Sequence, residues 1–299
     1  MIKHLQCCPL CGSKETSPFL AGSIDTSRLN NLSYASRKEP EFMNFPYVEC
    51  KICDLIYTPT PPENTALKQA YQTAEFDSAT EANFAAKTYR KIFSPWINLL
   101  SEKTCAVDIG AGNGALLPLL IEEGFNTTIG IEPSPAAIFS AQPEVRVMLR
   151  EGIFSREIIG DLTPDFICTS MTMEHVIDPL ELVKIAQDKL ASNGIIAVVV
   201  HNRRAVLNRL LGKRSPIIDI EHLQLFSPKS LELLFLKANL KPLFIGSFCN
   251  TYPLRYWIRL LPMRTEIKQR IIKMLEKLRL SQIAISLPVG NLLGIAQKQ

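Results

Sequence analysis

Long apolar runs are absent from this chain of 299 residues. No uninterrupted apolar stretch approaches the roughly 18 residues that a membrane-spanning helix needs, and the N-terminal residues MIKHLQCC lack the apolar segment of a secretory signal. We therefore expect a cytoplasmic protein. Charge of one sign is also scarce, because 33 Lys and Arg stand against 29 Asp and Glu. The net charge of +4 is too small to indicate a dedicated nucleic-acid binder, so we expect no nucleic-acid partner.

Cysteine is unevenly distributed, with five of the eight in the first 53 residues. Four of these five form two Cys-x-x-Cys pairs, Cys8 with Cys11 and Cys50 with Cys53. In a cytoplasmic protein such pairs indicate metal ligands before they indicate disulfides. Four thiolates complete the tetrahedral shell of Zn²⁺ and leave no open position for catalysis, so they predict a structural zinc.

The assignment of the zinc ligands has alternatives. Cys7 competes with Cys8 for the first ligand position, and His4 is either a further ligand or has no role. The loop between the two pairs is longer than in compact zinc ribbons, although Gly12 and Asp54, which follow the pairs, fit knuckle-like turns. The alternatives to zinc are a degenerate, metal-free module and simple buried thiols.

The pattern along the chain predicts three regions. Residues 1–60 lack helical periodicity and are rich in turn formers, which fits a small zinc-ribbon-like module. After a proline-rich boundary, residues 61–104 are expected to form a helical linker or cap that Pro95 breaks or restarts. Residues 105–299 alternate apolar strands with helices, and a basic helical insertion is expected at about 253–285.

The strands expected in the third region are nearly continuous apolar runs. Such strands, alternating with helices, are typical of a parallel sheet covered by helices on both faces. We therefore predict a doubly wound α/β fold with a mostly parallel, seven-stranded sheet. The expected strands are 105–109, 128–131, 145–149, 165–169, 195–200, 242–245 and 292–296.

The central motif is VDIGAGNG at residues 107–114, a strand that runs into a glycine loop. Glycines there let the backbone approach a ligand closely, and the N-terminus of the following helix adds free N–H donors. Glu132 ends the next strand, about where dinucleotide-binding folds place the acid that binds ribose. The spacing Gly110-x-Gly112-x-x-Ala115 also fits a dinucleotide fingerprint, so the loop alone does not exclude nicotinamide cofactors.

Five segments, taken in order, resemble the motifs of class I S-adenosylmethionine-dependent methyltransferases. The similarity covers roughly residues 80–250 and is nearest in pattern to ubiquinone-pathway O-methyltransferases and sugar C-methyltransferases. Some of those relatives carry an N-terminal zinc module. The resembling segments are DIGAGNG at 108–114, IGIEPS at 129–134, MEHVIDP at 173–179, LASNGI at 190–195 and EHLQLFSP at 221–228.

The resemblance implies S-adenosylmethionine as the methyl donor and assigns roles to individual residues. Asp108 and three glycines would surround the amino-acid part of the cofactor, and Glu132 would bind its ribose. Residues after the third strand would flank adenine, although the acid that usually follows there is missing. Met171 and Thr172 would line the methyl-transfer region. The three glycines are Gly110, Gly112 and Gly114, and the adenine residues are Gly152, Ile153 and Phe154.

Histidine is the natural general base near neutral pH, and the chain has only four. His175 and His222 each follow a glutamate in a family-like segment, and His201 ends the fifth strand on the ligand side of the sheet. We predict His222 as the catalytic base, with Glu221 orienting it or contacting the substrate, and His175 as the second candidate. The structural alternatives are that His175 bonds to a neighbouring loop and that His222 braces its own loop.

The basic stretch near the C-terminus has two interpretations. The preferred one is a surface helix whose apolar stripe packs on the core. The other is a lid or membrane-surface helix that handles an anionic or lipid-linked substrate. The apolar residues at helical spacing are Ile267, Ile271, Met274, Leu275 and Leu278, and the basic ones are Arg264, Lys268, Arg270, Lys273, Lys277 and Arg279.

These features together predict methyl transfer from S-adenosylmethionine to a small-molecule acceptor, which would be a sugar, a lipid-linked group or a secondary metabolite. Oxygen is favoured over carbon as the methylated atom. One alternative is an NAD(P)-dependent oxidoreductase that uses the same glycine loop. The other is a non-catalytic methyltransferase-like scaffold that binds a partner through the zinc module.

Overall fold

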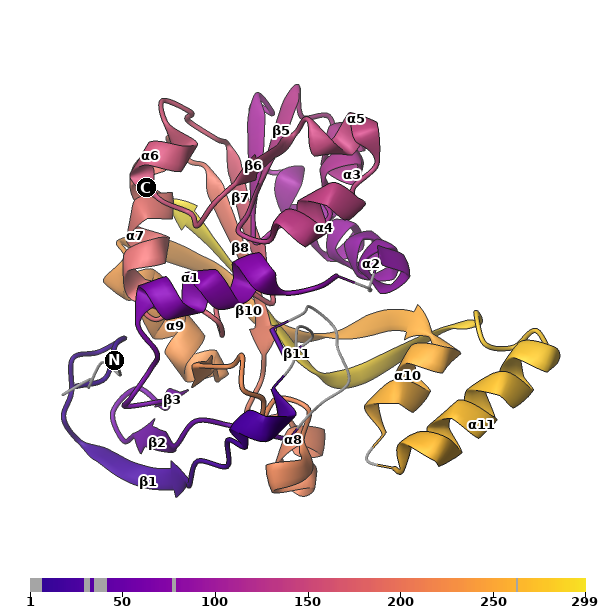
Figure 1. Cartoon of the computed structure of the whole chain (residues 1–299). Helices are drawn as coiled ribbons and strands as arrows, with labels where there is room; N and C mark the ends of the chain where they lie inside the picture. Colours follow the sequence, from indigo (N-terminus) through magenta and orange to yellow (C-terminus); the bar gives the residue numbers. More distant parts are fainter. Residues whose placement is uncertain (1–6, 30–32, 35–41, 77–78, 262) are drawn as a thin grey trace.

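The computed structural model describes residues 7–29, 33–34, 42–76, 79–261 and 263–299 (Figure 1). His4, the further zinc-ligand candidate, lies outside these residues. Within them, no helix is both long enough and apolar enough to cross a membrane.

A seven-stranded sheet forms the centre of the molecule, with strand order β10-β11-β8-β7-β4-β5-β6. Five of its strands are parallel to one another, and β11 runs antiparallel between β8 and β10. The predicted mostly parallel, seven-stranded α/β fold is therefore confirmed. The strands are β4 (Cys105–Ile109), β5 (Thr127–Glu132), β6 (Leu149–Glu151), β7 (Phe166–Ser170), β8 (Ile195–His201), β10 (Leu240–Pro253) and β11 (Ala284–Lys298).

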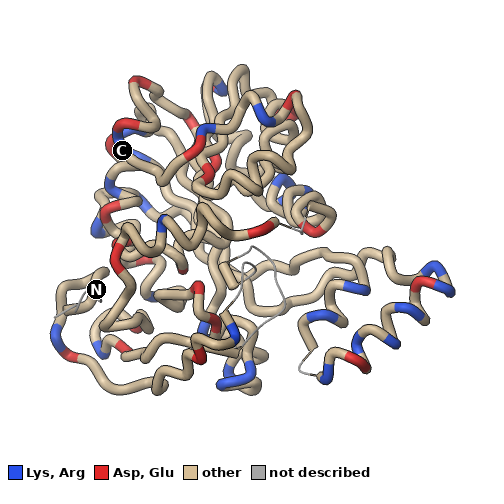
Figure 2. The backbone as a smooth tube through the Cα atoms, viewed as in Figure 1, with Lys and Arg blue, Asp and Glu red and all other residues tan. Residues whose placement is uncertain are grey.

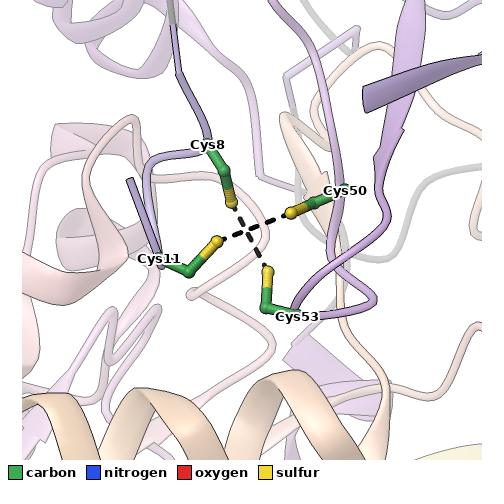
Figure 3. A group of neighbouring side chains, drawn as sticks. All are labelled: Cys8, Cys11, Cys50 and Cys53. Carbon is green, nitrogen blue, oxygen red and sulfur yellow. Dashed lines mark hydrogen bonds between the residues drawn. The ribbon is translucent and has the colours of Figure 1, made fainter. Parts of the chain in front are cut away.

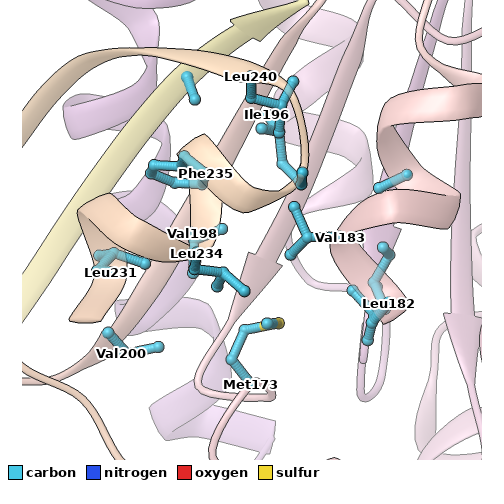
Figure 4. Packing of buried hydrophobic residues seen from close by; sticks show 14 of the residues in the cluster. Met173, Leu182, Val183, Ile196, Val198, Val200, Leu231, Leu234, Phe235 and Leu240 are labelled. Carbon is cyan, nitrogen blue, oxygen red and sulfur yellow. The ribbon is translucent and has the colours of Figure 1, made fainter. Parts of the chain in front are cut away.

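Helices cover both faces of this sheet, as continuous apolar strands require. On one face, α7 (Pro179–Lys189) and α9 (Pro228–Lys237) bury their apolar side chains against β8, and Figure 4 shows Val183, Leu234 and Phe235 packed near Val198. On the other face, α2 (Ala79–Ile97) and α3 (Leu117–Glu122) pack on the same strands. The short helices α4 (Pro135–Ser140), α5 (Pro143–Arg146) and α6 (Arg156–Ile159) follow β5 and β6.

Two local predictions are wrong. Residues 145–149 do not form the third strand, because Pro143 begins helix α5 and the strand β6 starts only at Leu149. Pro95 does not break the helix, because α2 continues through it to Ile97. Phe93 and Ile97, on either side of Pro95, are fully buried in the core, and this burial outweighs the loss of one backbone hydrogen bond.

A second, four-stranded sheet joins the N-terminal region to the main domain. Its order is β1-β2-β3-β9, where β1 (Thr16–Leu20), β2 (Tyr47–Cys50) and β3 (Ile56–Tyr57) come from the first 60 residues. The fourth strand, β9 (Gln224–Leu225), belongs to the loop between β8 and α9, and it pairs with β3. A short 3-10 turn, η1 (Thr26–Arg28), lies between β1 and β2. The N-terminal region is thus closed by a strand from the main domain.

The outer halves of β10 and β11 extend away from the body and carry two helices between them (Figure 1). These helices, α10 (Leu254–Leu260) and α11 (Thr265–Lys277), pack on each other. We call residues 254–283 the arm. The preferred sequence interpretation of α11 is wrong, because Ile267, Met274 and Leu278 are exposed and only Leu275 of the predicted stripe is buried.

Candidate active site

The glycine loop after β4 lies at the centre of the sheet, between the ends of β5 and β7. Gly110 and Gly112 have φ angles of 75° and 57°, which glycine adopts without strain. A Cβ on Gly110 would lie 2.2 Å from Oγ1 of Thr172, so no side chain fits there. A Cβ on Gly112 would meet nothing nearer than Phe76 at 4.0 Å. The Gly112 side of the loop is therefore open, and it faces a large cavity.

Glu132 is fixed beside this loop by two backbone hydrogen bonds. Its Oε2 accepts from the N–H of Gly112, and its Oε1 accepts from the N–H of Ser134, both at 2.8 Å. Burial raises the pKa of Glu132, whereas the two hydrogen bonds oppose that rise. A carboxylate offers about four lone-pair directions, so this one retains capacity to accept ribose hydroxyls.

The cavity has a volume of about 920 Å³ and extends from the glycine loop to the base of the arm. Nearly all residues that the sequence assigned to the cofactor lie on its wall: Asp108, Gly110, Gly112, Glu132, Gly152, Ile153, Phe154 and Met171. Gly114 does not. It packs behind the loop, where a Cβ would lie 2.6 Å from Val145. Helices α1 (Asn64–Thr73) and α2 contribute a further wall through Leu67, Tyr71 and Ala86.

Met171 has a φ angle of 56°, a left-handed backbone conformation that is unusual for a side chain of this kind. Its N–H donates to the carbonyl of Val199 at 2.8 Å, which holds the strained residue in place at the end of β7. Backbone strain of this type costs about 1–3 kcal/mol and clusters at functional sites. Met171 lines the cavity, and its place in the methyl-transfer region stays a prediction.

Three histidines from three different segments meet on the cavity wall. The ring centroids of His175 and His222 lie 5.1 Å apart, and those of His201 and His222 lie 5.4 Å apart. Glu221 joins them, with its Oε1 3.8 Å from Nδ1 of His175. The structure therefore brings together all three residues that the sequence predicted as catalytic, and it adds His201.

A hydrogen bond assigns the ring proton of His222. Nδ1 of His222 lies 2.8 Å from the carbonyl oxygen of Ile217, which can only accept, so Nδ1 carries the proton and Nε2 is the basic nitrogen of the neutral ring. At His175, Nδ1 lies 3.0 Å from the hydroxyl of Tyr71, which burial keeps protonated by raising its pKa. A hydroxyl can donate to this nitrogen or accept from it, so either tautomer of His175 satisfies the contact.

His201 is held as a neutral ring. Burial, followed by the proximity of His222, lowers the pKa of His201 to about 3. Its Nδ1 donates to Oδ1 of Asn291 at 3.1 Å. His201 therefore has an unprotonated Nε2, as His222 does, but its low pKa makes it a poor proton acceptor.

The two Glu-His segments of the sequence lie side by side. The carbonyl of Glu174 accepts from the N–H of Leu223 at 2.7 Å, which ties the loop before β9 to the loop after β7. The fully buried carboxyl of Glu174 accepts from the N–H of His201 at 2.6 Å. Burial raises the pKa of Glu174 to about 7. Glu174 therefore holds both His201 and the His222 loop in position.

Two asparagines place unpaired polar atoms against the cavity. Among the described residues, Oδ1 of Asn250 and Nδ2 of Asn291 have no hydrogen-bond partner, although both side chains are buried and line the cavity. A buried polar atom without a partner costs about 1–3 kcal/mol, which a ligand can recover. The part of the cavity nearer the arm is apolar and aromatic, and it is lined by Tyr252, Tyr256, Trp257, Leu260 and Leu261.

Sequence reasoning missed Tyr71, Asn250 and Asn291. Tyr71 lies in the region expected only as a helical linker or cap, and the asparagines lie in strands that are longer than predicted. Their partners in the site are distant in sequence, since Tyr71 contacts a residue 104 positions away and Asn291 one that is 90 positions away. No local pattern signals such contacts.

The four predicted zinc ligands, Cys8, Cys11, Cys50 and Cys53, converge within the N-terminal region (Figure 3). The sulfurs of Cys8 and Cys53 lie 3.5 Å apart, as do those of Cys11 and Cys50, and all four lie within 4.8 Å of one another. Zn–S bonds of about 2.3 Å place tetrahedral ligand sulfurs about 3.8 Å apart, so the four thiols fit this ion. A hydrogen bond from Cys53 lowers the pKa of the Cys8 thiol to about 6, which favours the thiolate that a metal binds.

Each Cys-x-x-Cys pair forms a knuckle-like turn, as predicted. Gly12 has a φ angle of 75° and donates its N–H to the carbonyl of Cys8, and Asp54 has a φ angle of 68° and donates to Cys50. Cys7 is not part of the four-sulfur group, which decides the first ligand position in favour of Cys8.

Comparison with known proteins is consistent with this geometry. A family model described as a methyltransferase domain matches residues 79–243, which is more than half of the chain. A SAM-dependent methyltransferase from Archaeoglobus fulgidus is similar at 18% identity over 79% of this chain and 100% of that chain, with a TM-score of 0.49. The plantazolicin methyltransferase BpumL, in complex with SAH, is similar at 17% identity over 80% of this chain and 91% of that chain, with a TM-score of 0.49. No curated protein matches the sequence.

Proposed function

The chain belongs to the methyltransferase domain family, and we propose that it transfers a methyl group from S-adenosylmethionine to an oxygen atom of a small, hydroxyl-bearing acceptor. The observation that carries the acceptor assignment is a set of polar groups on the cavity wall: His222 contacts His201, whose ring bonds to Asn291, and the buried amides of Asn291 and Asn250 have unpaired atoms on the same wall. The proposed relatives within the family remain the ubiquinone-pathway O-methyltransferases and sugar C-methyltransferases with an N-terminal zinc module.

The glycine loop and its surroundings would hold the cofactor. Gly112 leaves room for it, Glu132 would accept from the ribose hydroxyls, and Asp108 would face its amino-acid part. Gly152, Ile153 and Phe154 would flank adenine. When bound, S-adenosylmethionine supplies a methyl group on a positively charged sulfur, and the transfer leaves S-adenosylhomocysteine. The protein's own task is to place the acceptor in line and to exclude water.

His222 would remove the acceptor's proton. Its Nδ1–H is fixed by the carbonyl of Ile217, so Nε2 is the nitrogen that accepts the hydroxyl proton as the new O–C bond forms. The carboxylate of Glu221, which lies 3.8 Å from Nδ1 of His175, would offset the positive charge that then develops on this histidine cluster. His201, held neutral, would not compete for the proton.

The asparagines favour a hydroxyl group over an anionic one. Oδ1 of Asn250 needs a donor and Nδ2 of Asn291 needs an acceptor, and a hydroxyl offers both, whereas a carboxylate offers only the acceptor. The apolar end of the cavity, with Tyr256 and Trp257, would take an apolar part of the same molecule. These two ends support an amphipathic acceptor, such as a lipid-linked sugar or a prenylated phenol, that meets the protein at a membrane surface.

The three regions of the chain would have separate roles. Residues 1–60 would form a structural zinc module, residues 61–104 would cap the cavity, and residues 105–299 would carry the reaction. We place the protein in the cytoplasm, because four paired thiols persist as zinc ligands where the surroundings are reducing.

Two experiments test the proposal in sequence. S-adenosylhomocysteine should raise the melting temperature, because a ligand that binds the folded state stabilises it, and Gly112→Val should abolish that rise. A rise with NADH and none with S-adenosylhomocysteine would overturn the choice of cofactor. Methyl-labelled S-adenosylmethionine, offered with phenolic and sugar acceptors, should then give products whose carbon NMR shifts are those of O–CH3 groups. Only C–CH3 products would overturn the oxygen assignment.

The role of His222 is tested by His222→Ala. General-base catalysis contributes about 10²–10⁴-fold, so turnover should fall by that factor while S-adenosylhomocysteine binding is retained. The loss should be smaller at high pH for a phenol, which ionises without help. His201→Ala is the matched control, because it removes a neighbouring ring that does not accept the proton. A stable His222→Ala protein with wild-type turnover would contradict the assignment.

A further inference from the structure

The base of the arm and helix α8 (Val206–Leu211) border the same cavity. Leu207 and Leu211 of α8 line it, and so do Ile258 and Leu260 of α10 and Leu261, which follows α10. The cavity's apolar part is therefore walled by two helices that also face solvent. Figure 1 shows α8, α10 and α11 along the lower edge of the molecule.

Both helices expose large apolar side chains. Val206 and Leu210 of α8 are 71% and 79% exposed. On α11, Ile267, Met274 and Leu278 are 45%, 53% and 59% exposed, and their spacing of seven and four residues aligns them on one side of the helix. Leu275 faces a different direction and is buried, so the exposed stripe of α11 is distinct from the face by which it packs on the protein.

Positive charge surrounds these apolar side chains. Residues 254–283 contain eight Lys or Arg and two Glu, a net charge of +6, so the rest of the chain carries −2 of the total of +4. Figure 2 shows this concentration of basic residues along the arm. On α11, the exposed side chains of Arg270, Lys273 and Lys277 lie beside the apolar stripe. Next to α8, Arg209, Lys213 and Arg214 are exposed as well.

We propose that α8 and the arm form a cationic rim that docks on an anionic lipid surface, with the mouth of the acceptor cavity turned toward the lipid. An apolar stripe flanked by Lys and Arg is the pattern by which helices lie in a membrane interface. The proposal rests on the proposed function only in taking the cavity as the acceptor site. Docking would let an amphipathic acceptor pass from the lipid into the apolar end of the cavity.

The charge and the exposed apolar side chains of the rim together favour an anionic lipid surface over other binding partners. A second copy of the chain docked on this rim would bring the +6 of one arm against the +6 of the other, which opposes self-association. A nucleic acid would satisfy the charge but would leave the apolar side chains of α8 and α11 exposed to water. An anionic bilayer satisfies both, because phosphates meet the basic residues and the interface accepts the apolar stripe.

The experiment uses the full chain, without cofactor or acceptor, and vesicle flotation. The vesicles contain phosphatidylcholine alone or a mixture with phosphatidylglycerol. The protein should float with the mixed vesicles, should bind far less to phosphatidylcholine alone, and should be released by salt. Equal binding to both vesicle types, or binding to neither, would overturn the proposal.

Matched variants localise the contact. Each basic residue near an anionic surface contributes about fivefold to partitioning, so Lys273→Gln with Lys277→Gln should weaken binding roughly 30-fold. Met274→Ser with Leu278→Ser should also weaken it, because the apolar stripe is shortened. The control is Lys229→Gln with Lys241→Gln, two exposed lysines outside the rim, which should leave binding unchanged. Equal losses in the control would overturn the assignment to the rim.

Two further readouts keep the interpretation specific. Every variant should keep its thermal shift with S-adenosylhomocysteine, which separates failure of docking from failure of the fold or of the proposed function. Sedimentation velocity should show the same species for the wild type and for the Met274→Ser, Leu278→Ser protein. A wild-type dimer that this variant dissociates would assign the rim to a second copy of the chain and overturn the lipid proposal.

Discussion

The N-terminal region and the arm are both additions to the same sheet, but they treat their apolar residues in opposite ways. Leu55, Ile56 and Tyr57 of the N-terminal region are buried, and Leu55 and Tyr57 belong to the same apolar cluster as Val107 of the central strand. The arm keeps Met274 and Leu278 exposed. The apolar side chains of the N-terminal region are thus buried against the main domain, whereas the arm presents an apolar surface that the other described residues do not cover.

The two regions also differ in how they are attached. Arg203, which is buried, donates its Nε–H to the carbonyl of Asp54 at 2.7 Å and forms ion pairs with the carboxylates of Glu49 and Asp54. Tyr47 donates its hydroxyl to the carbonyl of His222 at 2.6 Å, so the N-terminal region also contacts the loop that carries His222. The arm is continuous with β10 and β11; α10 packs on β10, and α11 packs on α10. Damage to the first region should therefore reach the active site, and damage to α11 should not.

Loss of zinc should produce the largest effect. Cys50→Ser with Cys53→Ser should abolish the roughly one zinc per chain and destabilise the N-terminal region, because structural zinc contributes about 10–16 kcal/mol of binding free energy in zinc-finger peptides. Hydrogen exchange should accelerate at residues 47–57 and also at 217–225, but not in the arm. Cys7→Ser is the control and should keep the metal. Unchanged exchange at 217–225 would show that the two regions are not coupled.

The ion pairs of the buried Arg203 come second. Arg203→Gln should lower the free energy of unfolding by about 2–3 kcal/mol, because it removes the buried guanidinium that pairs with the half-buried carboxylates of Glu49 and Asp54 and donates to the Asp54 carbonyl. Arg204→Gln, a change at the exposed neighbour with the same acidic partners, should cost less than about 1 kcal/mol. Denaturant titration measures both values. Similar losses would mean that the buried arginine does not attach the N-terminal region in the manner described.

Glu174, which is hydrogen-bonded to His201 and to the loop that carries His222, allows a test of stability against pH. Its pKa rises from 4.5 to about 7 on folding, so the unfolded chain releases this proton first. The stability that the protonated carboxyl contributes is present below about pH 4.5 and is lost as the pH rises through 7. Relative to the wild type, Glu174→Gln should gain roughly 3 kcal/mol in unfolding free energy between pH 4.5 and pH 8. Glu232→Gln, an exposed change on α9, should show no such gain.

The smallest effect is expected in the arm. Leu278→Ser removes an apolar side chain that is mostly in solvent, so the free energy of unfolding should change by less than about 0.5 kcal/mol. Leu55→Ser, at a fully buried position of the N-terminal region, should cost several kcal/mol, as large-to-small core changes do. Thermal unfolding of the two variants compares the regions directly. A large loss in Leu278→Ser would mean that the stripe is covered.

The sequence predictions are accurate for features that depend on neighbouring residues and fail for those that depend on contacts distant in sequence. Strand β4 was placed correctly because all five of its residues are buried between neighbours, and an apolar run reports that burial. The strand expected at 145–149 failed because β6 has three residues at the sheet edge, and Pro143 and Val145 belong to a helix. In the site, the glycine loop and Glu132 are local features and were found. The pairing of His201 with Asn291 depends on strands brought together only by folding, so no local pattern contained it.

The pairing of β3 with β9 has a consequence during synthesis of the chain. The hydroxyl of Tyr47 can donate to the carbonyl of Asp219 only after a further 172 residues have been synthesised. At about 5–20 residues per second, a ribosome needs roughly 10–30 s to make that stretch. The cysteines therefore emerge first but complete their sheet last, and the apolar side chains of β2 and β3 stay open to chaperones in that interval. Zinc bound early to the nascent chain would keep the thiols from oxidising while they wait.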